Sequence, residues 1–151
     1  MNLSRSKKPH ILFINVNPRP SWKKEKTQIE FPMGLCYVAS ETKRARYNFD
    51  IVDLRVNYLS DQEVAESAKN GGYDVIALGG LSHNYYLIKS MVAKIKEYVP
   101  GALIVVGGNI VTAMPEKFLR WTNADVGVLG EGEYTFLEIL KRLETDNNLN
   151  G

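Results

Sequence analysis

Five short apolar runs, rich in valine and isoleucine, recur along the chain and alternate with segments in which apolar residues follow a helical spacing. An uninterrupted apolar run bounded by turn residues is typical of a parallel strand that is covered on both faces. The clearest of these runs is HILFINV, near the start of the chain. The predicted strands are residues 10–16, 49–54, 73–78, 102–106 and 125–129.

The segments between these strands carry the signals of helices. Between residues 88 and 95, four apolar residues recur at helical spacing and form one stripe. Ser60 is followed three residues later by Glu63, which predicts a capping box, and Gly71 and Gly72 end the same helix. The predicted helices are residues 33–46, 61–70, 84–99, 115–121 and 133–143.

This alternation of strands and helices predicts one parallel sheet with helices on both faces, joined by right-handed crossovers. We therefore predict an α/β fold of the flavodoxin-like (Rossmann-like) type, a three-layer sandwich around a five-stranded parallel sheet in the order 2-1-3-4-5. Residues 10–144 are expected to form this domain, after a flexible N-terminus at residues 1–9. The polar residues 145–151 are expected to form a tail.

The composition narrows the possible partners. With 151 residues, the chain is long enough to form one buried core. Its net charge of +2 is too small to create a strong positive electrostatic field that would attract nucleic acid. No apolar run approaches the ~20 residues of a membrane span, so we predict no membrane association and a cytoplasmic location. The single cysteine, Cys36, excludes an internal disulfide and is expected to be a buried structural thiol.

Glycines follow several of the predicted strands. Gly79 and Gly80 end the third strand, and Gly107 and Gly108 end the fourth. Ligands of open α/β sheets bind beyond the carboxyl ends of the strands. A glycine pair there either turns the chain tightly or lets a ligand approach the backbone closely. Because the pairs recur at one edge of the sheet, we favour room for a flat or bulky ligand.

The loop after the last strand, GEGEYT, superficially resembles a dinucleotide fingerprint. That motif belongs after the first strand, and here Thr135 replaces its third glycine. Glu131 and Glu133 would repel a pyrophosphate and are expected to accept hydrogen bonds from ligand amides or hydroxyls. No nucleophile elbow, P-loop lysine or metal-ligand spacing is present, and His83, a loop histidine with no potential metal ligand or catalytic partner near it in the sequence, is expected to be a surface or ligand-edge residue. The chain therefore carries no predicted catalytic residue or metal site of its own.

Three segments, taken in order, resemble a known family. They are residues 32–39 (PMGLCYVA), residues 107–109 (GGN) with Pro115 and Glu116, and residues 130–136 (GEGEYTF). This set resembles the N-terminal cobalamin-binding domain of B12-dependent radical S-adenosylmethionine enzymes, which include methyltransferases and the anaerobic magnesium-protoporphyrin monomethyl ester cyclase. The resemblance extends over nearly the whole chain, from residue 10 to about residue 143.

The resemblance implies a cobalamin site over the loops that end the strands. Residues 15–18 and 79–84 would line the nucleotide tail and the lower corrin face, while residues 107–112 and 130–133 would contact the corrin edge amides and the nucleotide. The cofactor-binding residues implied in this way are Asn15, Val16, Asn17, Pro18, Gly79, Gly80, Leu81, Ser82, His83, Asn84, Gly107, Gly108, Asn109, Thr112, Gly130, Glu131, Gly132 and Glu133.

Three departures from related patterns matter. Residues 15–19 (NVNPR) lack the histidine that supplies a lower axial ligand in the methionine-synthase type of B12 domain. The Ser-x-Leu of that type is Gly79-Gly80-Leu81 here, so Ser82 would have to supply the hydroxyl. The cysteine motif of the radical domain is absent. The 4Fe-4S cluster and S-adenosylmethionine are therefore expected only in a C-terminal radical domain, which the chain does not contain and to which its tail would lead.

Two main hypotheses follow. In the first, the chain is the cobalamin-binding module of a radical S-adenosylmethionine enzyme that performs methyl transfer or tetrapyrrole ring formation, with its own C-terminal domain as partner. In the second, it is a non-catalytic docking domain of the same fold that has lost B12 and recognises a substrate or a partner protein. The long basic loop at residues 17–32 supports the second hypothesis. A flavin or nucleotide in the same crevice is a third, weaker alternative.

Overall fold

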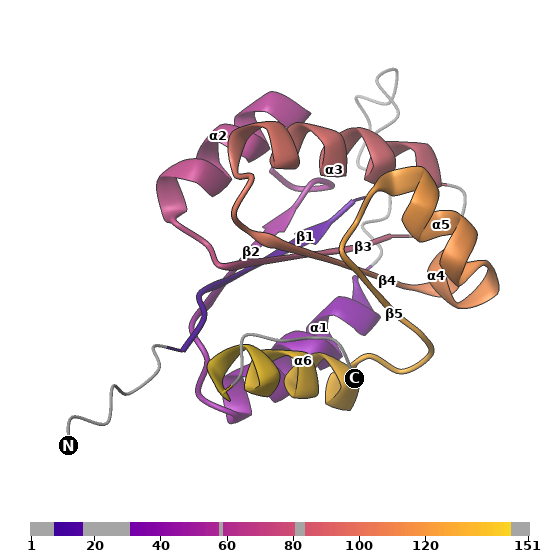
Figure 1. The fold of residues 1–151 in the computed structure, drawn as a ribbon. Helices are drawn as coiled ribbons and strands as arrows, with labels where there is room; N and C mark the ends of the chain where they lie inside the picture. The colour runs from indigo at the N-terminus through magenta and orange to yellow at the C-terminus, as the bar shows by residue number, and fades with distance from the viewer. Residues whose placement is uncertain (1–7, 17–30, 58, 81–83, 146–151) are drawn as a thin grey trace.

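A computed structural model describes residues 8–16, 31–57, 59–80 and 84–145, and its centre is one parallel sheet (Figure 1). The strand order is β2-β1-β3-β4-β5, and every neighbouring pair is parallel. This order confirms the predicted flavodoxin-like topology. The strands are β1 (Ile11–Asn15), β2 (Phe49–Asp53), β3 (Val75–Gly79), β4 (Leu103–Gly107) and β5 (Val126–Val128).

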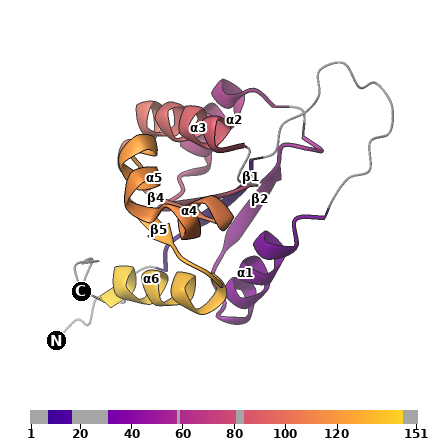
Figure 2. The same cartoon turned by 90° about the vertical axis from the view of Figure 1, so that its right-hand side faces the viewer.

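Helices cover both faces of this sheet, as the alternating pattern predicts (Figures 1 and 2). α1 and α6 lie on one face, and α2, α3, α4 and α5 lie on the other. One short helix, α4, was not predicted; it begins directly after the glycine pair of β4. The helices are α1 (Met33–Arg44), α2 (Asp61–Gly71), α3 (Tyr85–Tyr98), α4 (Asn109–Ala113), α5 (Pro115–Thr122) and α6 (Glu133–Thr145).

The core forms two apolar layers because side chains alternate across each strand. On the side of α2 and α3, Ile14, Ile76 and Ile104 pack against the predicted stripe of α3, whose four residues are fully buried. On the side of α1 and α6, Phe13 packs its ring against Phe136, with centroids 5.3 Å apart. The sheet is therefore covered on both faces, which explains the uninterrupted apolar runs of its strands.

The local signals around α2 are also confirmed. The Glu63 amide donates to the Ser60 hydroxyl at 3.3 Å, and the Ser60 amide donates to the Glu63 carboxylate at 2.7 Å. At the other end, Gly72 adopts a left-handed conformation with φ of 62°. α2 therefore begins and ends where its capping residues place it.

α1 begins at Met33, as predicted, but ends earlier than predicted. It stops at Arg44, two residues before the predicted end, and Arg46 has a positive φ of 64°. The first buried residue of α1 is Ala39, so the first turns of the helix receive little cover from the sheet. For this reason Cys36 is half-buried, and its prediction as a buried thiol was wrong. Within the described ranges, no helix is both long and apolar enough to cross a lipid bilayer.

At the amino edge of the sheet, Tyr73 donates a hydrogen bond to Asp50 at 2.8 Å. Burial, followed by this bond to a carboxylate, raises the pKa of Tyr73 from 10.0 to about 12. In the unfolded chain the phenol loses its proton near pH 10, whereas the folded protein keeps it until about pH 12. Unfolding therefore releases a proton in this window and becomes easier as the pH rises.

We expect the stability advantage of the wild type over Tyr73→Phe to shrink between pH 10 and about pH 12, because only the wild type has this phenol to ionise on unfolding. Urea midpoints of both proteins, measured at half-unit steps from pH 9, test this. Parallel decline of the two midpoints would show that Tyr73 contributes nothing to the alkaline loss of stability.

Candidate ligand-binding site

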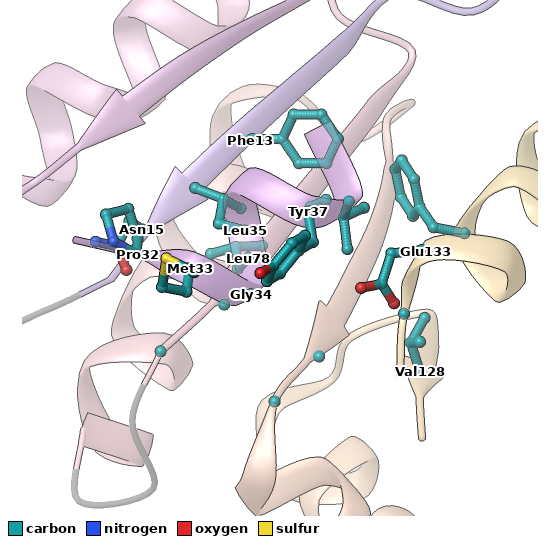
Figure 3. A pocket seen from close by; sticks show the side chains of 18 of the residues that line it. Phe13, Asn15, Pro32, Met33, Gly34, Leu35, Tyr37, Leu78, Val128 and Glu133 are labelled. Carbon is teal, nitrogen blue, oxygen red and sulfur yellow. The ribbon is translucent and has the colours of Figure 1, made fainter. Parts of the chain in front are cut away.

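A pocket of about 590 Å³ opens at the carboxyl edge of the sheet, between the first turns of α1 and α6 (Figure 3). Its volume falls within the ~300–1,000 Å³ that is usual for small-molecule sites. It lies on the α1 and α6 side, since Phe13, Ala77 and Val105 line it. This is the edge at which open parallel sheets bind ligands.

The floor of the pocket is one row of residues in register across the sheet. Asn15 pairs with Gly79, Gly79 pairs with Gly107, and Gly107 pairs with Val128. A Cβ atom built on Gly79 would meet nothing within 4 Å, and one built on Gly107 would meet only Val128, at 3.9 Å. The two glycines thus leave open space that side chains would fill.

The second glycine of each pair has a different role. A Cβ atom on Gly80 would lie 2.6 Å from the carbonyl oxygen of Val16, closer than real Cβ contacts. Gly108 has a φ of 106°, and its Cβ atom would lie 3.0 Å from the carbonyl oxygen of Gly80. The sequence left open whether the glycine pairs turn the chain or make room. In the structure the first member of each pair makes room and the second lets backbones pack.

Hydrogen bonds hold the polar residues of the floor and rim in place. The side-chain amide of Asn15 donates to the Asp53 carboxylate at 3.0 Å, and the backbone amide of Arg55 donates to the same oxygen at 3.0 Å. Across the pocket, the Gly130 amide donates to the hydroxyl of Thr112 at 2.9 Å. This last bond ties the loop after β5 to α4, so the rim is fixed at both sides of the floor.

One wall of the pocket comes from the chain entering α1 and from its first turns. Met33 and Tyr37 are 53% and 55% exposed, and Phe31, just before the helix, is 67% exposed. All three line the pocket together with Leu35 and Val38. Sequence reasoning considered only the loops after strands and missed this wall. The available signal was Met33 and Tyr37, two large apolar residues four positions apart and outside the stripe that packs on the sheet.

The opposite wall carries the only charged groups among the described lining residues, Glu131 and Glu133. Figure 3 shows Tyr37 from α1 and Glu133 from α6 facing the pocket from its two sides. Across the part of the chain that the structure describes, no lysine, arginine or histidine lines the pocket, and no group of three or more potential metal ligands occurs. His10 lies at the amino edge, where it contacts Asp50 at 3.3 Å.

The structure brings most of the predicted site residues to this one pocket. Two predicted residues do not line it: Val16 is 1% exposed and packs in the other core layer, and Asn84 is fully buried at the residue preceding α3. Residues 17, 18 and 81–83 of the prediction lie outside the described residues. The predicted residues that line the pocket are Asn15, Gly79, Gly80, Gly107, Gly108, Asn109, Thr112, Gly130, Glu131, Gly132 and Glu133.

The fold and the pocket together define a doubly wound α/β domain with a small-molecule site at the carboxyl edge of its sheet. A family model described as the B12 binding domain matches residues 26–140. The chain belongs to this family of B12-binding domains.

Individual curated proteins are also similar to this chain, but they are much longer than it. The chain is 30% identical over 120 residues to the anaerobic magnesium-protoporphyrin IX monomethyl ester cyclase of Cereibacter sphaeroides, which covers 77% of this chain and 19% of that protein. It is 27% identical over 143 residues to the cytidylyl-2-hydroxyethylphosphonate methyltransferase of Streptomyces wedmorensis, covering 80% of this chain and 27% of that protein. The chain thus spans about a fifth to a quarter of the relatives it matches.

Solved structures share the fold at low sequence identity. The cobalamin-dependent S-adenosylmethionine radical enzyme OxsB with aqua-cobalamin bound superposes with a TM-score of 0.77 at 18% identity, over 93% of this chain and 19% of that chain. The radical S-adenosylmethionine methyltransferase TsrM from Kitasatospora setae gives a TM-score of 0.71 at 13% identity, over 89% of this chain and 26% of that chain.

Proposed function

We propose that this chain binds cobalamin in the pocket at the carboxyl edge, as the cofactor-binding module of a radical S-adenosylmethionine enzyme. The observation that carries the proposal is the floor at Gly79 and Gly107, where Cβ atoms would enter open space in a member of the B12-binding family. A broad ring system needs such a surface because ordinary side chains would hold it away from the backbone.

The residues of the pocket fit the parts of such a ligand. Gly79 and Gly107 would lie under it, while the apolar wall of Met33 and Tyr37 would cover its carbon skeleton. Glu131 and Glu133 would accept hydrogen bonds from its amides. When bound, the corrin cobalt supplies methyl-transfer or redox chemistry that side chains cannot. Because the described lining contains no histidine, none of these residues would provide an imidazole ligand to cobalt.

The catalytic steps would take place in a longer parent protein. Residues 10–144 would form the cofactor module and residues 145–151 would lead to a C-terminal domain that holds a 4Fe-4S cluster and S-adenosylmethionine. Relatives that are methyltransferases or a cyclase, and that are about four to five times longer than the matched segment, support this arrangement. The reaction of the parent, methyl transfer or tetrapyrrole ring formation, and its cytoplasmic location remain predictions.

Reconstitution tests the binding proposal directly. The purified chain is incubated with hydroxocobalamin, desalted, and examined by absorbance spectroscopy. We expect the corrin bands to elute with the protein at close to one equivalent per chain. A folded protein that emerges colourless, with unchanged circular dichroism, would contradict the proposal.

The second candidate is a docking domain that has lost B12. It is favoured by two large exposed side chains: Phe31, which lines the pocket, is 67% exposed, and Tyr134, next in sequence to the lining residue Glu133, is 81% exposed. Such residues on a surface often mark a contact with another protein. A docking domain would retain no corrin, so the reconstitution separates the two candidates.

A further inference from the structure

The charge of the pocket is one-sided. Its described lining carries two carboxylates and no basic side chain, so among the described residues the loop after β5 presents only negative charge to the pocket. Carboxylates accept hydrogen bonds and cannot donate them when ionised. The loop is therefore suited to neutral groups that donate N–H bonds and unsuited to anionic groups.

The carboxylates are held in place by the structure of their loop. The amide of Gly130 is bound to Thr112, and the carbonyl oxygen of Gly132 accepts the Phe136 amide at 2.8 Å. On its other side the loop packs so closely on α1 that a Cβ atom on Gly132 would lie 3.3 Å from Val38. These contacts fix the backbone from which Glu131 and Glu133 project.

Nothing in the described part of the chain neutralises these two side chains. Neither carboxylate forms an ion pair or a hydrogen bond with another described residue. Glu133 begins the 13-residue helix α6, whose N-terminus favours negative charge. Figure 3 shows its carboxylate directed toward the pocket.

We propose that Glu133, together with Glu131, makes this site selective for corrinoids whose peripheral side chains are carboxamides over those that carry carboxylates. The inference rests on the proposed function and specifies the ligand class of the same pocket. A carboxamide donates an N–H bond to Glu133, whereas a carboxylate at the same position adds a like charge without a donor. The two ligands differ by one functional group and hardly in shape, so the discrimination is electrostatic.

The test compares hydroxocobalamin with its derivatives in which a single propionamide has been hydrolysed to propionate, each isomer separately. Dissociation constants are measured by equilibrium dialysis at pH 7.5 and low salt. We expect the wild type to bind at least one isomer about tenfold or more weakly than hydroxocobalamin, because like charges in contact repel strongly in a partly dehydrated site. This ratio should fall as salt is added.

Glu133→Gln is expected to bring the ratio for that isomer to about twofold, because the glutamine amide can both donate and accept. The matched control is Glu138→Gln, on the same helix, whose exposed carboxylate pairs with Arg142 at 3.3 Å outside the pocket. This control should keep the wild-type ratio.

If the wild type binds hydroxocobalamin but discriminates against no isomer, the selectivity is refuted while the proposed function stands. Discrimination that survives the double variant Glu131→Gln/Glu133→Gln would equally overturn it. Failure of the wild type to bind hydroxocobalamin refutes the proposed function itself.

Discussion

Replacing Gly80 with alanine is expected to destabilise the domain by about 3 kcal/mol, the upper part of the range for overpacked sites. The added Cβ atom would lie 2.6 Å from the Val16 carbonyl oxygen, which belongs to the backbone and cannot rotate away. The adjacent amide of Val16 donates to Gly79 at 2.8 Å. Relief of the clash would therefore separate β1 from β3 at the edge that carries the pocket.

The same substitution one residue earlier is the control. Gly79→Ala adds its Cβ atom to open space, so stability should stay unchanged or rise by up to about 1 kcal/mol from reduced freedom of the unfolded chain. Urea unfolding followed by circular dichroism gives both free energies of unfolding. Equal effects of the two variants would mean that Gly80 does not closely approach Val16.

Most of the architecture was predictable because buried parallel strands appear in the sequence as short uninterrupted apolar runs. Each observed strand overlaps its predicted range, and α2 begins at the residue set by Ser60 and Glu63. The strand order followed from the alternation of elements together with the rules of crossover handedness. The five-residue helix α4 escaped prediction because Asn109–Ala113 is too short to show a helical period.

The site was only partly predictable, for physical reasons that differ between residues. Loops after strands were identifiable because topology alone brings them to one edge. The wall at Met33 and Tyr37 forms because the first turns of α1 extend beyond the sheet. No local sequence pattern predicts how far a helix extends in this way. The different roles of Gly79 and Gly80 depend on backbone distances that only the folded chain defines. Val16 is the last residue of the predicted first strand, but its side chain packs in the other core layer.

Gly79→Val is expected to weaken hydroxocobalamin binding by about tenfold to a hundredfold while leaving the fold intact. Valine suits a strand end and would project from the pocket floor into space that the ligand requires. Fitting a bulky ligand over it would cost about 1–3 kcal/mol, as for other overpacked sites, which corresponds to that loss of affinity.

The matched control is Gly101→Val, since a Cβ atom there also meets nothing within 4 Å but lies away from the pocket, before β4 begins. Gly108 is a poorer probe: with a φ of 106° and a Cβ atom 3.0 Å from Gly80, its substitution would distort the backbone as well as fill the site. Dissociation constants from equilibrium dialysis and urea midpoints are measured for both valine variants. If Gly79→Val binds hydroxocobalamin as tightly as Gly101→Val does, the ligand does not rest on the glycine floor, and the proposed mode of cobalamin binding is wrong even where the wild type retains the cofactor.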